Sequence, residues 1–298
     1  MSIKGYKAFK RGMICKGKQY EENTTYEENG NKICEAGVMH FCENPFDVLN
    51  YYPLIDEDGN ISDFADVEAI GDIYKEKDKT ATNKLHIGAK LGFKGFIKAC
   101  VDFTIEKTKA ETVKADDVGI SSGDYAKIGS SGDYAKIGSS GYSAQIGSSG
   151  DYAKIGSSGY SAKIGSSGYS AQIGSSGDYA QIGSSGYSAK IGSSGYYAQI
   201  GSSGDYAQIG SSGDYAQITS KGNNSVVMAA GYNSIVKAKI GSWITLAEWI
   251  RTGKTNDSGK YIWIPKCVKT ECVDGERIKE DTFYKLVDGE FKEVESEE

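Results

Sequence analysis

The sequence predicts a mainly β protein with a central β-solenoid of nine-residue repeats, an α+β N-terminal domain and a small β C-terminal cap. Two observations lead to this fold class. A nine-residue unit recurs at a fixed period through the middle of the 298-residue chain, and the composition combines 39 glycines with only 3 prolines. Glycine without proline argues against a collagen-like chain or a proline-rich linker. The predicted parts are residues 1–110, 115–240 and 241–298.

The N-terminal part has an ordinary globular composition. Strands are expected at residues 6–9 and 67–74. A first helix should begin at Asn44, because Asn is a good N-cap and Pro45 suits the first helical position, and it should run to about Tyr52. A second helix is expected over residues 92–106, where apolar side chains recur at helical spacing.

The repeat predicts a solenoid. The unit Ile-Gly-Ser-Ser-Gly-x-x-Ala-(Lys/Gln) occurs ten times in succession from Ile128, after a shortened copy at Ile120 and before degenerate copies at Gly222 and Gly231. One such unit cannot bury its own apolar face, so the units must stack. A disordered Gly/Ser linker is the alternative, but a linker has no reason to keep Ile and Ala in phase.

Within the unit, Gly-Ser-Ser-Gly is expected to form the bend and x-x-Ala-Lys-Ile the strand. Strand alternation then places Ala and Ile in the core, with Tyr and the Lys or Gln outward. The coil size stays open. Grouping the units by threes sorts the variable positions and favours a 27-residue coil, although duplication of a 27-residue block leaves the same trace. The thin Ala/Ile core favours a two-sided coil of 18 residues.

After Ile240 the repeat stops, and Trp243 and Trp249 appear where an open solenoid end needs covering. Strands are expected at residues 261–268 and 282–286. Asp-Gly pairs at Asp274 and Asp288 indicate turns. This region is interpreted as the cap.

The sequence offers no convincing catalytic, cofactor or metal site. Asp occupies too few units for a calcium-binding β-roll, and no nucleophile elbow, Walker loop or dinucleotide fingerprint occurs. Cys15, Cys34, His40 and Cys42 could supply a Cys₃His zinc site, but they lack a Cys-x-x-Cys pair and regular spacing. Ordinary buried cysteines are the simpler interpretation.

Charge and hydropathy exclude further classes. The net charge of −6 and the near balance of Asp and Lys in the repeats argue against a nucleic-acid partner or a DNA mimic. The chain has no apolar run that could span a membrane and no signal peptide, and its six cysteines are too few for a disulfide scaffold. A cytoplasmic protein is expected.

The tyrosines are the best candidate binding residues. Twelve of the 21 tyrosines lie in the repeats among Ser and Gly, a combination typical of protein-binding loops. Tyr also favours strands and stacks well, so the same pattern could serve stability alone. The predicted binding surface comprises Tyr125, Tyr134, Tyr142, Tyr152, Tyr169, Tyr179, Tyr196, Tyr206 and Tyr215.

Two resemblances add context. Residues 222–238 look like the repeats of trimeric bacterial adhesin heads. The whole chain resembles phage- and prophage-encoded proteins of Firmicutes with an N-terminal domain of unknown function, nonapeptide repeats and a strand-rich cap. The matching segments are Tyr6-Lys7-Ala8-Phe9, residues 40–52 beginning His40-Phe41-Cys42, the repeats, and Gly241-Ser-Trp-Ile-Thr-Leu-Ala-Glu.

These observations favour a non-enzymatic accessory protein whose solenoid binds a macromolecular partner. The phage resemblance implies that the partner is a host protein, that the protein acts in the host cytosol, and that it could inhibit a host defence. Two alternatives remain. The order of Tyr6-Lys7, Gly37-Val-Met-His40 and a following helix resembles mono-ADP-ribosyltransferases, which would make the N-terminal domain an NAD-dependent enzyme. A structural virion or fibre component is the other. The oligomeric state is not predicted.

Overall fold

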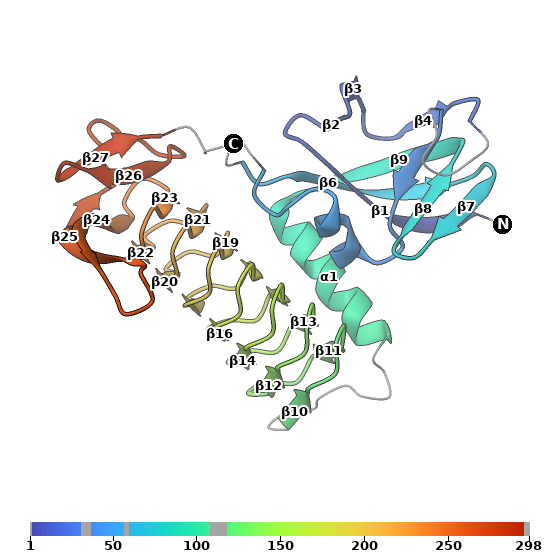
Figure 1. The fold of residues 1–298 in the computed structure, drawn as a ribbon. Helices are drawn as coiled ribbons and strands as arrows, with labels where there is room; N and C mark the ends of the chain where they lie inside the picture. Colours follow the sequence, from blue (N-terminus) through green and yellow to red (C-terminus); the bar gives the residue numbers. More distant parts are fainter. Residues whose placement is uncertain (1, 31–36, 57–59, 108–117, 295–298) are drawn as a thin grey trace.

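The computed structural model describes residues 2–30, 37–56, 60–107 and 118–294. The protein is mostly β, with an α+β N-terminal region, a two-sided solenoid of about seven turns and a C-terminal strand cap (Figure 1). The predicted fold class is therefore confirmed. Among the described residues, no helix is long and apolar enough to cross a membrane.

The N-terminal region contains two antiparallel sheets and a short hairpin. The four-stranded sheet has the order β1 (Ile3–Phe9), β6 (Asp63–Ala69), β9 (Lys84–Leu91) and β4 (Thr24–Glu27). The three-stranded sheet has the order β5 (Met39–Phe41), β8 (Lys79–Thr82) and β7 (Ile73–Glu76), and the hairpin pairs β2 (Ile14–Cys15) with β3 (Lys18–Gln19).

The helices follow the predictions with one difference. The α-helix α1 (Phe93–Lys107) lies where the apolar spacing placed it. The earlier segment is a 3₁₀ helix, η1 (Pro45–Asn50), and it ends before Tyr52. Its predicted cap is confirmed, because the Asn44 side chain accepts a hydrogen bond from the Phe46 N–H at 3.1 Å. The single strand expected at residues 67–74 is divided between β6 and β7, and the Asn83 side chain holds the intervening turn at Asp72.

The solenoid consists of two parallel sheets that face each other. The sheet that we call the open sheet contains β10 (Val118–Ser121), β12 (Lys136–Ser139), β14 (Lys154–Ser157), β16 (Gln172–Ser175), β18 (Lys190–Ser193), β20 (Gln208–Ser211) and β22 (Val226–Ala229). The other, the covered sheet, contains β11 (Lys127–Ser130), β13 (Gln145–Ser148), β15 (Lys163–Ser166), β17 (Gln181–Ser184), β19 (Gln199–Ser202), β21 (Gln217–Ser220) and β23 (Ile235–Lys237).

The strand register decides the coil size. Ile137 pairs with Ile155 in the open sheet, and Ile146 pairs with Ile164 in the covered sheet, so each coil contains 18 residues and two units. The 27-residue alternative is wrong. Two sheets whose inner faces carry only Ile, Ala and Ser enclose a thin space that these side chains fill, and a three-sided coil would leave a void at its centre.

The inward positions of Ala and Ile are confirmed, since Ala171 is 0% and Ile173 4% exposed. The bend and strand positions were wrong. The strand is Lys/Gln-Ile-Gly-Ser, and Tyr lies in the turn rather than in the strand. The second turn residue takes a left-handed backbone, as at Tyr152 (φ 55°). The glycine before the turn is required for another reason: a Cβ at Gly177 would lie 1.9 Å from the carbonyl oxygen of the preceding coil.

The predicted cap is confirmed. Strands β24 (Trp243–Thr255) and β25 (Tyr261–Cys272) extend the open sheet, and β26 (Tyr284–Val287) and β27 (Glu290–Glu293) extend the covered sheet. The solenoid core continues into the cap through Leu246, Tyr284 and Leu286. The Trp249 indole donates to the Ala230 carbonyl at 2.9 Å. The last coil is thereby closed by antiparallel pairing.

Candidate functional site

Two continuous ladders of aromatic rings run along the two edges of the solenoid, where the turns lie. In the first-edge ladder, neighbouring rings are 4.5 to 5.8 Å apart between centroids, and the series ends on a tryptophan of the cap: Tyr125, Tyr142, Tyr160, Tyr179, Tyr196, Tyr197, Tyr215, Tyr232 and Trp263. In the second-edge ladder the centroids are 5.1 to 5.8 Å apart: Tyr134, Tyr152, Tyr169, Tyr187 and Tyr206.

All nine tyrosines chosen from the sequence belong to these ladders. Sequence reasoning missed the members that make them continuous, namely Tyr160, Tyr187, Tyr197, Tyr232 and Trp263. Tyr occupies either the first or the second turn position, and the two positions looked unrelated in a linear pattern. Once coils stack at 18 residues, rings from both positions meet on one edge.

The turns hold these rings in place while leaving them half exposed. Tyr152 is 41% and Tyr206 47% exposed. The Tyr152 N–H donates to the carbonyl of Tyr169 in the next coil at 2.8 Å, and the equivalent bond recurs along both edges. A ring that is already stacked and anchored loses little conformational entropy when another molecule covers it.

The aspartates of the turns have a structural role. The Asp151 carboxylate accepts a hydrogen bond from the Tyr169 N–H at 2.7 Å, across one coil. All six aspartates of the repeats do the same: Asp124, Asp133, Asp151, Asp178, Asp205 and Asp214. Within the ranges that the structure describes, no three His, Cys, Asp or Glu side chains are grouped closely enough to hold a metal ion.

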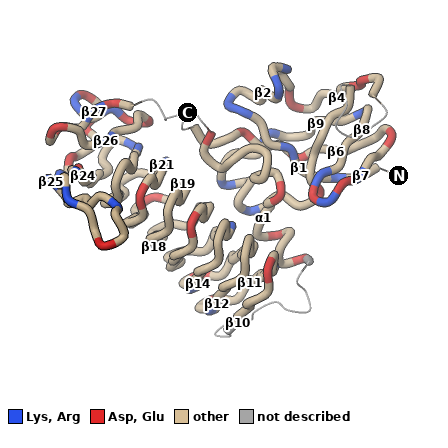
Figure 2. The backbone as a smooth tube through the Cα atoms, in the orientation of Figure 1, with Lys and Arg blue, Asp and Glu red and all other residues tan. Residues whose placement is uncertain are grey.

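The tyrosine hydroxyls are un-ionised at neutral pH. Burial raises the pKa of Tyr196 to about 12, and the neighbouring Tyr215 adds to the shift. The same two causes raise the pKa of Tyr160, beside Tyr179, and of Tyr187, beside Tyr206. The ladders therefore offer neutral rings and phenol hydroxyls. Lys and Asp alternate sparsely along the coils, so the solenoid carries no one-sign stripe (Figure 2).

The two sheets of the solenoid differ in what lies on them. Helix α1 and η1 pack on the covered sheet (Figure 1), where the Lys or Gln positions that were expected to point to solvent are instead buried. Gln145 exchanges hydrogen bonds with Asn44 (2.9 Å) and Asp47 (3.0 Å). Lys163 donates to the Phe46 carbonyl at 3.1 Å. The prediction of an outward Lys/Gln row was wrong for this sheet.

Glycine makes that packing possible. A Cβ at Gly183 on the covered sheet would lie 2.3 Å from the Ile97 side chain, and one at Gly147 would lie 3.1 Å from the Val101 backbone. On the open sheet, a Cβ at Gly174 would meet nothing within 4 Å. The open sheet thus presents a shallow groove whose floor is glycine and whose side is a Lys/Gln row.

The residues of the hypothetical zinc site do not gather around one point. Cys34 lies outside the described residues. Cys15 accepts a hydrogen bond from the Tyr52 hydroxyl at 3.2 Å, and burial raises the pKa of Cys42 to about 12. The His40 pKa is lowered to about 4, first by burial and then by the charge of Lys7. A neutral His40 and a protonated Cys42 thiol follow at physiological pH.

The fold and these surfaces define a two-sheet β-solenoid, with tyrosine-lined edges, docked against a small α+β domain. Residues 3–99 match a domain of unknown function, DUF7666. No curated protein and no solved structure matches the chain. The matched region corresponds to the N-terminal domain up to the first half of α1 and leaves out the repeats and the cap.

Proposed function

We propose that the protein is a non-enzymatic binding protein whose solenoid engages a macromolecular partner through its tyrosine ladders. The observation that carries the proposal is the continuity of the rings. Two ladders of half-exposed tyrosines extend along both edges, and their backbone is anchored at each turn by bonds to the next coil.

Tyrosine suits such a role because its ring supplies a large contact area and its hydroxyl a hydrogen bond at low entropic cost. Stacking within a ladder also stabilises the coils, so the rings serve both purposes. Partner contact then accounts for what stacking alone leaves open, namely rings that remain about 40 to 50% exposed, as in Tyr134, Tyr152 and Tyr206.

The kind of partner follows from the resemblance to phage-encoded proteins. A phage protein of this type would act in the host cytosol on a host protein, and one consequence would be the inhibition of a host defence. Nucleic acid is a poor fit, because the repeats carry no dense one-sign charge.

The experiment replaces the five tyrosines of the second-edge ladder by asparagine: Tyr134, Tyr152, Tyr169, Tyr187 and Tyr206. Asparagine already occupies both turn positions at Asn223 and Asn224, where Asn224 has a φ of 53°, so the turns are expected to fold. The wild-type chain captures its partner from host-cell extract, and affinity for the purified partner is then measured for each variant.

Two matched variants complete the design. One replaces Tyr142, Tyr160 and Tyr179 of the first-edge ladder by asparagine. The other replaces Lys136, Lys154 and Lys190 of the open sheet by glutamine, which occurs at the same position in other units. We expect at least one ladder variant to lose most of its affinity and the lysine variant to keep it. Unchanged affinity in both folded ladder variants would make the solenoid a spacer.

A further inference from the structure

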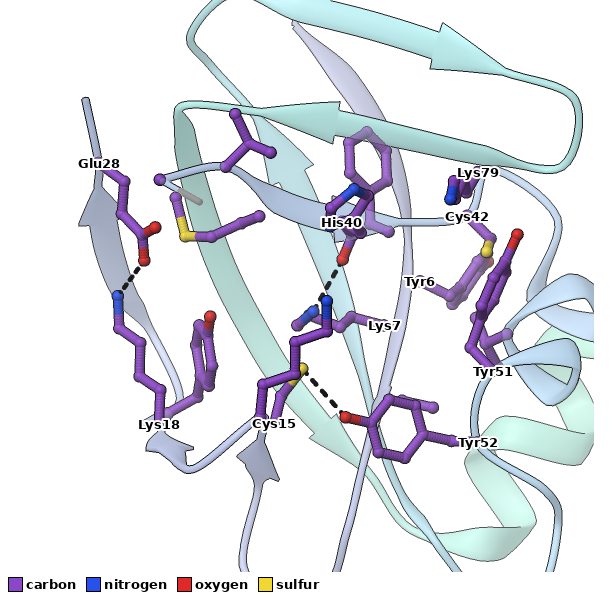
Figure 3. A pocket seen from close by; sticks show the side chains of 18 residues that line it. Tyr6, Lys7, Cys15, Lys18, Glu28, His40, Cys42, Tyr51, Tyr52 and Lys79 are labelled. Atoms are coloured by element: carbon purple, nitrogen blue, oxygen red, sulfur yellow. Dashed lines mark hydrogen bonds and ion pairs between the residues drawn. The ribbon is translucent and has the colours of Figure 1, made fainter. Parts of the chain in front are cut away.

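A cavity of about 500 Å³ lies inside the N-terminal domain, apart from the solenoid edges. Strand β1, the β2–β3 hairpin, strand β5 and the end of η1 surround it (Figure 3). Cavities that bind small molecules usually fall between about 300 and 1,000 Å³ and are mostly apolar with a few polar groups. This cavity has that character, because apolar side chains such as Val38, Met39 and Val48 form part of its wall.

The polar groups of the cavity are mainly cationic. Lys7, Lys16, Lys18 and Lys79 line it, whereas Glu28 is the one carboxylate among its described lining residues. Glu28 is already paired with Lys18, at 2.5 Å between the ammonium nitrogen and the carboxylate oxygen. The remaining positive charge has no counterpart in the wall of the cavity.

Lys7 is the central feature. Its side chain is only 6% exposed, its ammonium donates to the His40 carbonyl at 2.8 Å, and it lies 5.5 Å from the ring centres of Phe9 and Tyr20. Over the described parts of the chain, no carboxylate forms an ion pair with it. Burying an ammonium without a counter-charge is unfavourable, so the bare cavity leaves a cost that a bound anion would offset.

Neutral hydrogen-bonding groups complete the cavity. Burial raises the pKa of Tyr20, Tyr51 and Tyr52, so these hydroxyls remain protonated. The buried Nε2 of His40 has no hydrogen-bond partner among the described residues. Protein groups that are buried without a partner usually meet water or a ligand.

We propose that this cavity binds a small organic anion, with a phosphate or carboxylate group at Lys7 and a flat apolar body against Tyr52 and the neighbouring aliphatic wall. The four lysines supply charge and the single buried ammonium supplies the anchor. The site is independent of the tyrosine ladders, so either proposal can fail without the other.

The test uses the full chain and four probes: phenyl phosphate, benzoate, inorganic phosphate and phenol. Binding is measured by titration calorimetry and by the shift in thermal unfolding. Phenyl phosphate or benzoate is expected to bind saturably, and the stronger of the two identifies the anionic group. Inorganic phosphate should bind more weakly because it lacks the ring, and phenol because it lacks the charge.

Lys7→Met keeps the apolar stem and removes the charge, and it should weaken binding about tenfold or more, as loss of a charge-assisted hydrogen bond does. Lys98→Met is the matched control, since Lys98 is exposed and pairs with Asp102 on α1, away from the cavity. If Lys7→Met does not fold, acetylation of the wild-type chain read by mass spectrometry replaces it. The probe should then protect Lys7 and leave Lys98 reactive. Absence of binding by all charged probes, equal affinity in a folded Lys7→Met, or no protection of Lys7 would overturn the proposal.

Discussion

The open sheet and the covered sheet of the solenoid are built from the same nine-residue unit, yet they have different surroundings. Lys154 on the open sheet is exposed, whereas Lys163, one unit later on the covered sheet, is 6% exposed and bonded to η1. Gly174 and Gly183 differ in the same way. The burial of a residue in a repeat is therefore decided by what packs on its sheet, and identical units give matched pairs for measuring that difference.

The largest effects should appear where the two sheets are alike. Ile164→Asp on the covered sheet and Ile173→Asp on the open sheet both place a carboxylate in the shared core, where each isoleucine is at most 4% exposed. Each should lower the free energy of unfolding by roughly 3–5 kcal/mol, the cost of an uncompensated buried charge. Urea denaturation measures it, with the exposed Tyr179→Asn as control. A mild effect at one site only would mean that the core is not shared.

The glycine pair should separate the sheets. Gly183→Val inserts a side chain where a Cβ would already lie 2.3 Å from Ile97, so it should cost about 1–3 kcal/mol by overpacking. Gly174→Val on the open sheet should change stability by less than about 0.5 kcal/mol, as surface substitutions usually do. Thermal unfolding measures both. Equal effects would show that helix α1 does not rest on the covered sheet.

The lysine pair should show a smaller difference. Lys163→Met leaves the Phe46 carbonyl without its donor and is expected to cost about 1–3 kcal/mol, the price of a buried unsatisfied polar group. Lys154→Met removes an exposed side chain and should be neutral within about 0.5 kcal/mol. Denaturant midpoints compare the two. A stable Lys163→Met would indicate that burial of this ammonium cancels the benefit of its hydrogen bonds.

The smallest effect concerns pH. On the covered sheet, burial lowers the pKa of Lys237 to about 8, Asp281 opposes the shift and Lys221 adds to it. Because the unfolded chain then binds more protons than the folded chain, stability should rise as the pH increases from about 8 toward 10.5. Lys237→Met should remove this contribution. Unfolding free energies of both proteins across that range give the difference, and identical slopes would contradict the shift.

The sequence was most informative where the repeat is periodic. Ile and Ala recur in one phase, and that phase correctly identified the core. The strand was misplaced because Tyr usually favours strands and Gly usually favours bends. In this solenoid Gly lies in the strand so that α1 can approach, and Tyr takes a left-handed turn held by the next coil.

Longer-range features had no local pattern from which to be predicted. The unit on the covered sheet reads like the unit on the open sheet, so docking of α1 could not be inferred from either. Residues such as Tyr6, Lys7 and His40 were noticed for their order in the chain. Their common cavity, however, depends on how β1, β5 and η1 pack, which spacing alone does not specify.

The 18-residue register makes the array a heritable ruler. Adding one coil would move the cap away from the N-terminal domain by about one strand spacing, roughly 4.8 Å, without changing its orientation. Adding one unit of nine residues would instead exchange the roles of the two sheets and turn the cap half a revolution. Unequal recombination among near-identical units can therefore change either the reach of the molecule or the direction in which its two ends face.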